Sequence, residues 1–460
     1  MTDKYRRDLT EGSVGRLLIK FAVPFLISMI LQAFYSVVDM LVVGYYMGDY
    51  GISAVNNSSI MTMFITGLVS GFALSGTVLV AQYIGAKDEK QASSTIGTLF
   101  TIFIIVGAVI TVIGLLGSNA LLTALNTPIE AVDEARGYLK ICFAGTIFIC
   151  GYNAVSSVLK GLGDSKRPLY FVIISTVVNI FLDILFVGPF SMGAAGAALA
   201  TIIAQGLSFI LAVATLKKTG FIFDFKFRSF GIEPDKAKKI FKIGLPSAVQ
   251  ATVVNFSILF VTSEINRFGL VASTATGICG KIDSFAILPT IAISQAVASM
   301  AGQNLGAGKY DRARQTTMAG IGISYAFSTL IFILVRLYAQ EIVTLFGCTD
   351  EALSIAKMYI SIVSYAYLFN AYTFIINGLA TGSGNSLFAM FNAVINMILA
   401  RIPLIYLFVH VFDWGLEGIF IAMGFSQISG VIASFIFYGS KKWRKSLVSG
   451  MPPEGQENVT

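Results

Sequence analysis

Four carboxyl groups lie inside long apolar stretches of this sequence, where acidic side chains are uncommon. They belong to Asp39, Asp183, Glu264 and Asp283. An ionised carboxylate in apolar surroundings is costly, so such residues are functional candidates by default. A carboxyl group there can hold a proton near neutral pH or, when deprotonated, offer its oxygens to a hard cation such as Na⁺. These residues therefore predict reversible binding of H⁺ or Na⁺, with Asp39 and Asp183 as the candidate Na⁺ ligands.

Polar side chains recur at helical spacing around two of these acids. The stripe that ends on Asp39 comprises Gln32, Tyr35 and Ser36. Asn179 and Asp183 lie one turn apart farther along the chain, and Thr201 and Gln205 repeat that spacing. Because residues three or four apart share one face of a helix, each stripe predicts a polar face inside an apolar helix.

The two acids of the carboxyl half form a second candidate site, for which a structural role is an equal alternative. Glu264 and Asp283 have basic neighbours, Arg267 and Lys281, so an ion pair would also explain them. Arg401 is a basic residue inside an apolar run, and it fits a counter-ion and a helix-packing anchor equally well.

The elements that must position these residues are membrane-spanning helices. Apolar residues make up 55% of the 460 residues and charged residues only 12%. Runs of about 20 apolar residues recur, the length that a helix needs to cross a bilayer. They lack the alternation of barrel strands, so the fold class is all-α. Twelve spans are predicted near residues 17–44, 54–83, 94–117, 137–160, 168–188, 193–216, 240–266, 272–301, 315–338, 356–380, 387–410 and 415–438.

Basic residues gather in alternate loops between these spans. The basic clusters lie near residues 87–90, 160–167, 217–242, 309–314 and 441–445, besides the amino terminus. By the positive-inside rule they face the cytoplasm, which places both termini there. The net charge of +7 is thereby explained without nucleic acid, since no aromatic-interleaved basic patch is present.

The two halves of the chain resemble each other. Three segments return in order at offsets of 222, 221 and 222 residues: IKFAVP at 19–24 and FKIGLP at 241–246, AQYIGAKDEKQA at 81–92 and GQNLGAGKYDRA at 302–313, and GAAGAALATIIAQ at 193–205 and GLEGIFIAMGFSQ at 415–427. This indicates duplication of a six-helix unit. Because six is even, the copies insert in the same orientation, related by a pseudo-two-fold axis along the membrane normal.

The domain organisation follows from the duplication. An amino-terminal six-helix lobe is predicted over 1–216, a basic cytoplasmic linker over 217–239, a carboxy-terminal lobe over 240–439 and a cytoplasmic tail over 440–460. Pro24 falls inside the first span, where its missing hydrogen bond could form a hinge or a simple packing kink.

At this level the sequence resembles the multidrug and toxic compound extrusion (MATE) transporters, in the prokaryotic branch that includes DinF-like and MepA-like exporters. The resemblance covers about residues 14–440. It depends on VVDMLVVG at 37–44, AQYIGAKD at 81–88, LKGLGDSKRP at 159–168 and NIFLDILFV at 179–187. It implies two six-helix lobes around a central cavity, and export of cationic or amphipathic molecules in exchange for H⁺ or Na⁺.

The resemblance also implies roles for residues. The ion site of the amino lobe would comprise Asp39, Asn179, Asp183 and Thr201, and the substrate cavity would include Gln32, Tyr35, Ser36, Asn153 and Gln205. An acid at position 183 favours H⁺ over Na⁺. In the carboxyl lobe Glu264 could match the family's seventh-helix acid, whereas the tenth span offers Asn370 and Tyr372 where an acid would be expected.

Other functions fit the sequence less well. An enzyme is disfavoured because the single histidine, His410, excludes multi-histidine metal sites, and no GxxxxGK[ST] loop for ATP is present. A flippase for lipid-linked precursors would need a cationic cavity for the pyrophosphate, whereas the candidate cavity of the first half is acidic. Duplicated lobes with isolated acids suit a gated carrier better than the continuous pore of a channel. We therefore expect a monomeric, ion-coupled exporter in a prokaryotic plasma membrane, without cofactors other than the coupling ion.

Overall fold

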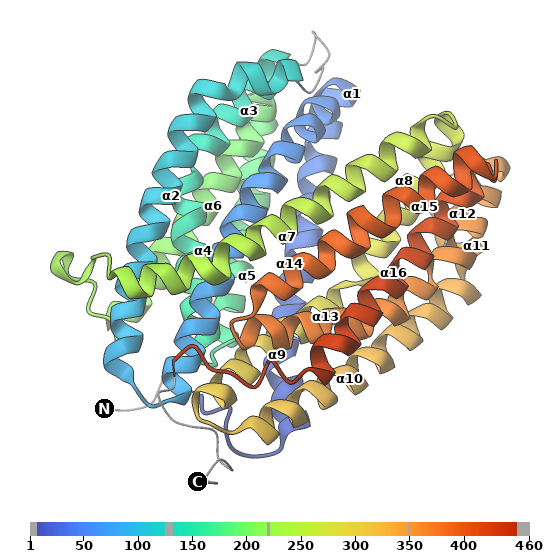
Figure 1. Ribbon diagram of the computed structural model, residues 1–460. Helices are drawn as coiled ribbons and strands as arrows, with labels where there is room; N and C mark the ends of the chain where they lie inside the picture. Colours follow the sequence, from blue (N-terminus) through green and yellow to red (C-terminus); the bar gives the residue numbers. More distant parts are fainter. Residues whose placement is uncertain (1–6, 125–131, 219–220, 348, 449–460) are drawn as a thin grey trace. The chain divides into compact units, whose positions relative to one another are not determined.

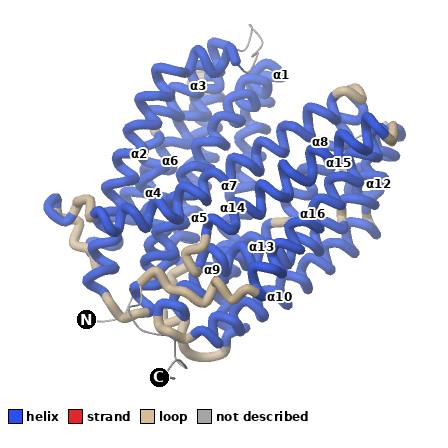
Figure 2. The backbone as a smooth tube through the Cα atoms, in the orientation of Figure 1, coloured by secondary structure: helices blue, strands red, loops and turns tan. Residues whose placement is uncertain are grey.

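The computed structural model describes residues 7–124, 132–218, 221–347 and 349–448, and only the backbone for residues 49, 50, 52–54, 56–61 and 124. The first residues of the predicted amino lobe and residues 449–460 of the predicted tail lie outside this range. In the part that is described, most residues belong to helices and loops connect these helices, as Figure 2 shows. The all-α prediction is confirmed.

The helices of the first half are α1 (Val14–Gly85), α2 (Glu89–Ala124), α3 (Val132–Ala144), α4 (Thr146–Gly161), α5 (Lys166–Val187) and α6 (Gly193–Lys218), followed by the short η2 (Phe227–Ser229). Those of the second half are α7 (Pro234–Asn266), α8 (Leu270–Ala286), α9 (Leu288–Gly306), α10 (Tyr310–Leu337), α11 (Ala339–Thr344), α12 (Asp350–Val363), α13 (Tyr365–Gly382), α14 (Ser386–Val394), η3 (Ile395–Ala400), α15 (Arg401–Tyr406), η4 (Leu407–Val411) and α16 (Gly415–Gly439). Most of them are labelled in Figure 1.

These helices account for the predicted number of spans. Within the described residues, ten helical segments are long and apolar enough to cross a membrane, and two bent pairs bring the number to twelve. The bent pairs are α3 with α4, at 46°, and α12 with α13, at 43°. They are the fourth and tenth spans, so the same span is bent in each half. The helix α1 contains two spans, separated by non-helical backbone at Gly48.

The chain divides into two compact units. The amino unit comprises residues 1–8 and 27–244, and the carboxyl unit comprises residues 9–26 and 245–460. The division falls within α1, between Leu26 and Ile27 and shortly after Pro24, which lies inside the helix. The first part of α1 thus belongs to the carboxyl unit, although it is followed directly in the sequence by the amino unit.

Each unit uses a glycine to bring two helices together at the same place. A Cβ atom on Gly161 would lie 2.8 Å from the carbonyl oxygen of Thr77 in the amino unit. A Cβ atom on Gly382 would lie 2.5 Å from the carbonyl oxygen of Ala298 in the carboxyl unit. Gly382 lies 221 positions after Gly161, and Ala298 lies 221 positions after Thr77. The internal repeat seen in the sequence therefore extends to the packing of the helices.

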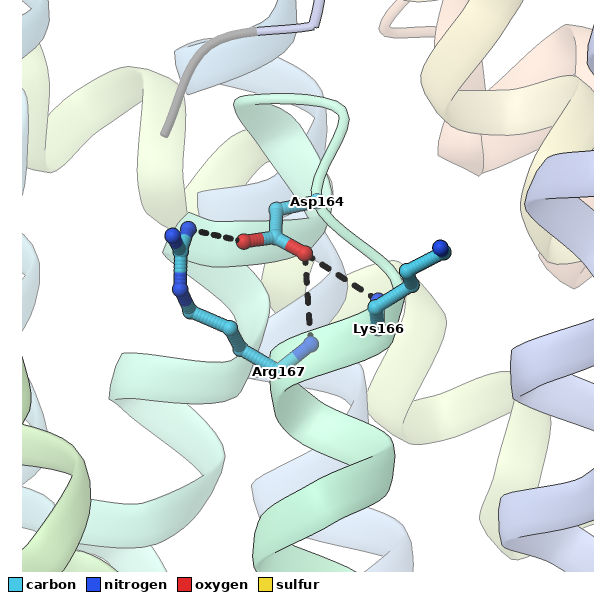
Figure 3. Close-up of polar contacts among 3 residues, drawn as sticks. All are labelled: Asp164, Lys166 and Arg167. Carbon is cyan, nitrogen blue, oxygen red and sulfur yellow. Dashed lines mark hydrogen bonds and ion pairs between the residues drawn. The ribbon is translucent and has the colours of Figure 1, made fainter. Parts of the chain in front are cut away.

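The LKGLGDSKRP motif forms the turn that starts α5. Gly163, at φ 83°, supplies the left-handed backbone that ends α4. Asp164 then accepts hydrogen bonds from the backbone N–H groups of Lys166 and Arg167, at 3.1 and 3.2 Å, and pairs with the Arg167 guanidinium (Figure 3). These bonds satisfy donors at the amino end of α5. The motif therefore has a structural task, which is to fix the helix that carries Asn179 and Asp183.

Candidate functional site

The helices α5 and α6 pack closely and bring their polar stripes together. Asp183 is fully buried and Asn179 almost so, on one face of α5. The amide Nδ2 of Asn179 donates to the Thr201 hydroxyl on α6, at 3.3 Å. Small residues at the start of α6, from Gly193 to Ala200, allow this approach because they leave little side chain between the helices. The structure thus joins three of the four residues of the predicted ion site.

Asp39 completes the cluster from α1. Its carboxyl group lies within hydrogen-bonding reach of Asp183, so the two can share a proton. Tyr35, one turn earlier on α1, lies close enough to interact electrostatically with both acids. Two carboxyl groups in contact cannot both be ionised without repulsion, which makes the pair a natural place for a proton or a cation.

The oxygens of this cluster lack donors. Among the described residues, buried oxygens without a hydrogen-bond partner include Oδ1 of Asp39, both carboxylate oxygens of Asp183 and Oδ1 of Asn179. Two more belong to Thr176 and Gln205, on the same helices. Buried polar atoms are normally satisfied, so a group of orphaned acceptors needs an explanation. Acceptors without donors suit a proton or a hard cation with oxygen ligands.

The other residues predicted for the substrate cavity lie differently. Gln32 and Ser36 are exposed on α1, and Gln32 donates to the Ser28 carbonyl of its own helix at 3.2 Å. Asn153 on α4 likewise donates to the Ile149 carbonyl, at 2.8 Å. Neither amide bonds to the acids. Each of these amides thus donates to a carbonyl of its own helix.

In the carboxyl unit Asp283 is held by two tyrosines. Tyr359 and Tyr367 donate to its two carboxylate oxygens at 2.6 and 2.5 Å. Tyr359 belongs to α12 and Tyr367 to α13, so Asp283 on α8 is hydrogen-bonded to both helices of the bent pair. Asp283 therefore bonds to tyrosines, whereas the sequence suggested Lys281 as its neighbour. Unlike Asp183, it has donors for both oxygens.

Glu264 lies in an ion pair near the end of α7. Its Oε2 atom is 3.3 Å from a guanidinium nitrogen of Arg267 and 4.0 Å from Nε2 of His410. The sequence had offered this pairing with Arg267 as the structural alternative for Glu264. Of the tenth-span residues, Asn370 is partly exposed, and Tyr372 is buried in a stack on Phe435 with ring centroids 4.3 Å apart.

Arg401 is buried and has neutral partners. Its Nε donates to the Ser426 hydroxyl and Nη1 to the Ser257 hydroxyl, both at 3.2 Å. No carboxylate of the described residues lies within 4.0 Å of it. The residue 222 positions earlier is Asn179, so the second copy has a cation where the first has an amide beside two acids.

Several contributors were not among the predicted site residues. Tyr359, Tyr367, Ser257 and Ser426 contact predicted residues, and none had been singled out from the sequence. The repeat could have found Ser257, because it lies 222 positions after Tyr35. The tyrosines had no sequence signal, since their contact with Asp283 joins separate helices. No group of three or more His, Cys, Asp or Glu that could hold a metal exists in the described ranges.

Comparison with known proteins matches this architecture to one family. The sequence profile named MatE matches residues 24–185 and again residues 246–407, an offset of 246 − 24 = 222. The chain belongs to the MatE family. Its members are transporters and not enzymes, so the prediction of a MATE transporter is confirmed. Two matches at this offset agree with the duplication seen in the sequence.

Curated relatives cover nearly the whole chain. A probable multidrug resistance protein of Bacillus subtilis, YpnP, is 29% identical over 95% of this chain and 97% of its own length. A probable multidrug resistance protein of Thermotoga maritima, NorM, is 26% identical over 95% of this chain and 94% of its own length. The solved structure of a MOP superfamily transporter from Pyrococcus furiosus shares the fold, with a TM-score of 0.89 at 21% identity over 94% of this MATE chain and 97% of that chain.

Proposed function

We propose that this MATE transporter is a secondary active exporter that moves cationic or amphipathic small molecules out of a prokaryotic cell in exchange for H⁺. The observation that supports the proposal is the pair Asp39 and Asp183, whose carboxyl groups lie together among buried oxygens without donors. An exporter of this kind needs a group that binds an ion on one side of the membrane and releases it on the other. The pair is the best candidate in the amino unit.

The chemistry of the pair also favours a cationic substrate. A deprotonated carboxylate attracts a cation, and protonation removes that attraction. Ion and substrate would then use the same negative charge in turn, which is what exchange requires. The relatives named as multidrug resistance proteins support export of drug-like molecules. Na⁺ is the alternative coupling ion, because the oxygens of Asp183, Asn179 and Thr176 are also suitable ligands for it.

The test is transport of a fluorescent lipophilic cation into inverted membrane vesicles under separately imposed pH and Na⁺ gradients. We expect uptake under the pH gradient alone, and loss of that uptake in Asp183→Asn and Asp39→Asn. Asp413→Asn is the matched control, since this exposed acid has φ 55° and asparagine tolerates the left-handed region. Uptake driven only by Na⁺ would assign Na⁺ instead, and uptake without either gradient would contradict coupled export.

A further inference from the structure

The amino unit contains an apolar cavity that the transport site does not use. It encloses about 300 Å³ and lies between α2, α4, α6 and the segment of residues 221–230, here called the linker segment. Its lining comprises Phe103, Ile147, Cys150, Ala154, Phe209 and Val213, among others. Ile104, which is half exposed on α2, also lines the cavity, and other apolar residues of that helix are exposed. The cavity therefore borders an apolar surface suited to lipid.

The linker segment is fixed against α2 and forms one wall of this cavity. A Cβ atom on Gly97 would lie 2.3 Å from the carbonyl oxygen of Ser229, so only glycine permits the approach. Farther along, the N–H of Glu233 donates to the Thr98 hydroxyl at 3.2 Å. The wall is thus built by specific contacts within the amino unit.

Aromatic rings complete the wall. Phe100 of α2 lies against Phe223, Phe225 and Phe230 of the linker segment, with ring centroids 5.5, 5.8 and 6.3 Å apart. Phe100, Phe225 and Phe230 also line the cavity. Rings packed in this way give an apolar surface with little freedom to collapse. An occupant of the cavity would therefore contact α2 and the linker segment at once.

One cation stands at the cavity without an acidic partner. Lys217, which lines it, lies 5.9 Å from the centre of the Phe225 ring. Within the described ranges it makes no ion pair. The nearby acid Asp224 is engaged elsewhere: hydrogen bonds from the Ser229 hydroxyl and the Lys226 backbone hold its pKa below the usual value. The lining of the cavity therefore carries the positive charge of Lys217 and includes no acidic residue.

The linker segment also carries an exposed aromatic residue between two bases. Phe227 is 95% exposed, and Lys226 and Arg228 flank it. Aromatic side chains beside basic residues favour the headgroup region of a membrane, especially where the lipids are anionic. This exposed aromatic residue with its two basic neighbours does not line the cavity, and it also indicates contact with an anionic lipid surface.

We infer that the cavity takes one acyl chain of an anionic phospholipid, whose headgroup phosphate contacts Lys217. An acyl chain matches the apolar lining, and the phosphate matches the positive charge of Lys217. A cationic drug fits less well because Lys217 would repel it. A bound lipid would hold the linker segment, which connects the two units along the chain, against α2. This site is separate from the proposed ion site, and it does not depend on the proposed function.

The test is native mass spectrometry of the full-length protein, released from detergent, with phosphatidylglycerol or phosphatidylcholine of identical chains. We expect one tightly bound phosphatidylglycerol and weaker binding of phosphatidylcholine. Lys217→Gln should weaken phosphatidylglycerol binding roughly fivefold, the factor expected for one lysine near an anionic headgroup. Lys218→Gln is the control, because this exposed neighbour does not line the cavity.

Filling the cavity tests the position of the acyl chain. Val213→Trp should abolish the binding of both lipids at this site. If Val213→Trp does not fold, the smaller change Val213→Phe replaces it in the test, and we expect it to weaken the binding of both lipids. Val109→Trp is the control on α2, since Val109 is half exposed and does not line the cavity. Equal binding of the two lipids to the parent, or unchanged binding after Val213→Trp or Val213→Phe, would overturn the inference. Displacement of the lipid by a transported cation would overturn it as well.

Discussion

Asp183→Asn separates the proposed transport role of the acid pair from the stability of the fold. Asparagine has nearly the same shape as aspartate, so the substitution creates no cavity. Apart from a proton shared with Asp39, neither carboxylate oxygen of Asp183 has a hydrogen-bond donor among the described residues. The new amide N–H group can instead donate to Asp39, whose Oδ1 atom has no donor. We therefore expect the free energy of unfolding to change by less than about 1 kcal/mol.

Transport should respond very differently. The amide cannot release a proton, so uptake driven by a pH gradient should fall at least about tenfold, which corresponds to about 1.4 kcal/mol. The assay measures uptake of a fluorescent cation into inverted vesicles, and thermal unfolding of the purified protein in detergent. A variant that transports like the parent would refute the reasoning. A variant that loses transport only because it unfolds would refute the claim that Asp183 contributes little to the stability of the fold.

Three further predictions follow from the contacts of other residues. Asp283→Asn should lower the free energy of unfolding by about 1.5–3 kcal/mol, because the amide oxygen can replace only one of the two carboxylate oxygens that accept from Tyr359 and Tyr367. Thermal unfolding measures this change, and an unchanged stability would contradict the two hydrogen bonds. Gly161→Ala should cost about 1–3 kcal/mol, since its Cβ meets backbone at Thr77, whereas Gly117→Ala in open space should not. Tags at both termini should be protected from an impermeant reagent in intact cells, and labelling of either would contradict the charge bias.

The span pattern and the duplication could be predicted from the sequence because both depend on local composition. Each apolar run predicts its own helix, and the offset of about 222 residues follows from comparing the repeated segments of the sequence. The helix limits were less predictable. The helix α7 begins at Pro234, inside the segment predicted as linker, because the basic residues there are compatible with a helix that extends beyond the bilayer.

The amino-unit site could be predicted in part. Helical spacing placed Asn179 and Asp183 on one face, but only packing between helices brings Asp39 to Asp183 and Thr201 to Asn179. The tyrosines that hold Asp283 could not be predicted, since they lie 76 and 84 residues away in the sequence. A contact between distant helices leaves no periodic trace in a single sequence.

The central claim is that substrate cation and proton compete for the Asp39 and Asp183 pair. The most direct measurement is the binding affinity of a permanently charged cation for the purified protein in detergent, across roughly pH 5 to 9, a range that brackets carboxyl groups in apolar surroundings. The account predicts that affinity falls as pH decreases, by up to about tenfold per pH unit where one proton is exchanged, and that Asp39→Asn flattens this dependence. An affinity that does not depend on pH in the parent would contradict the account.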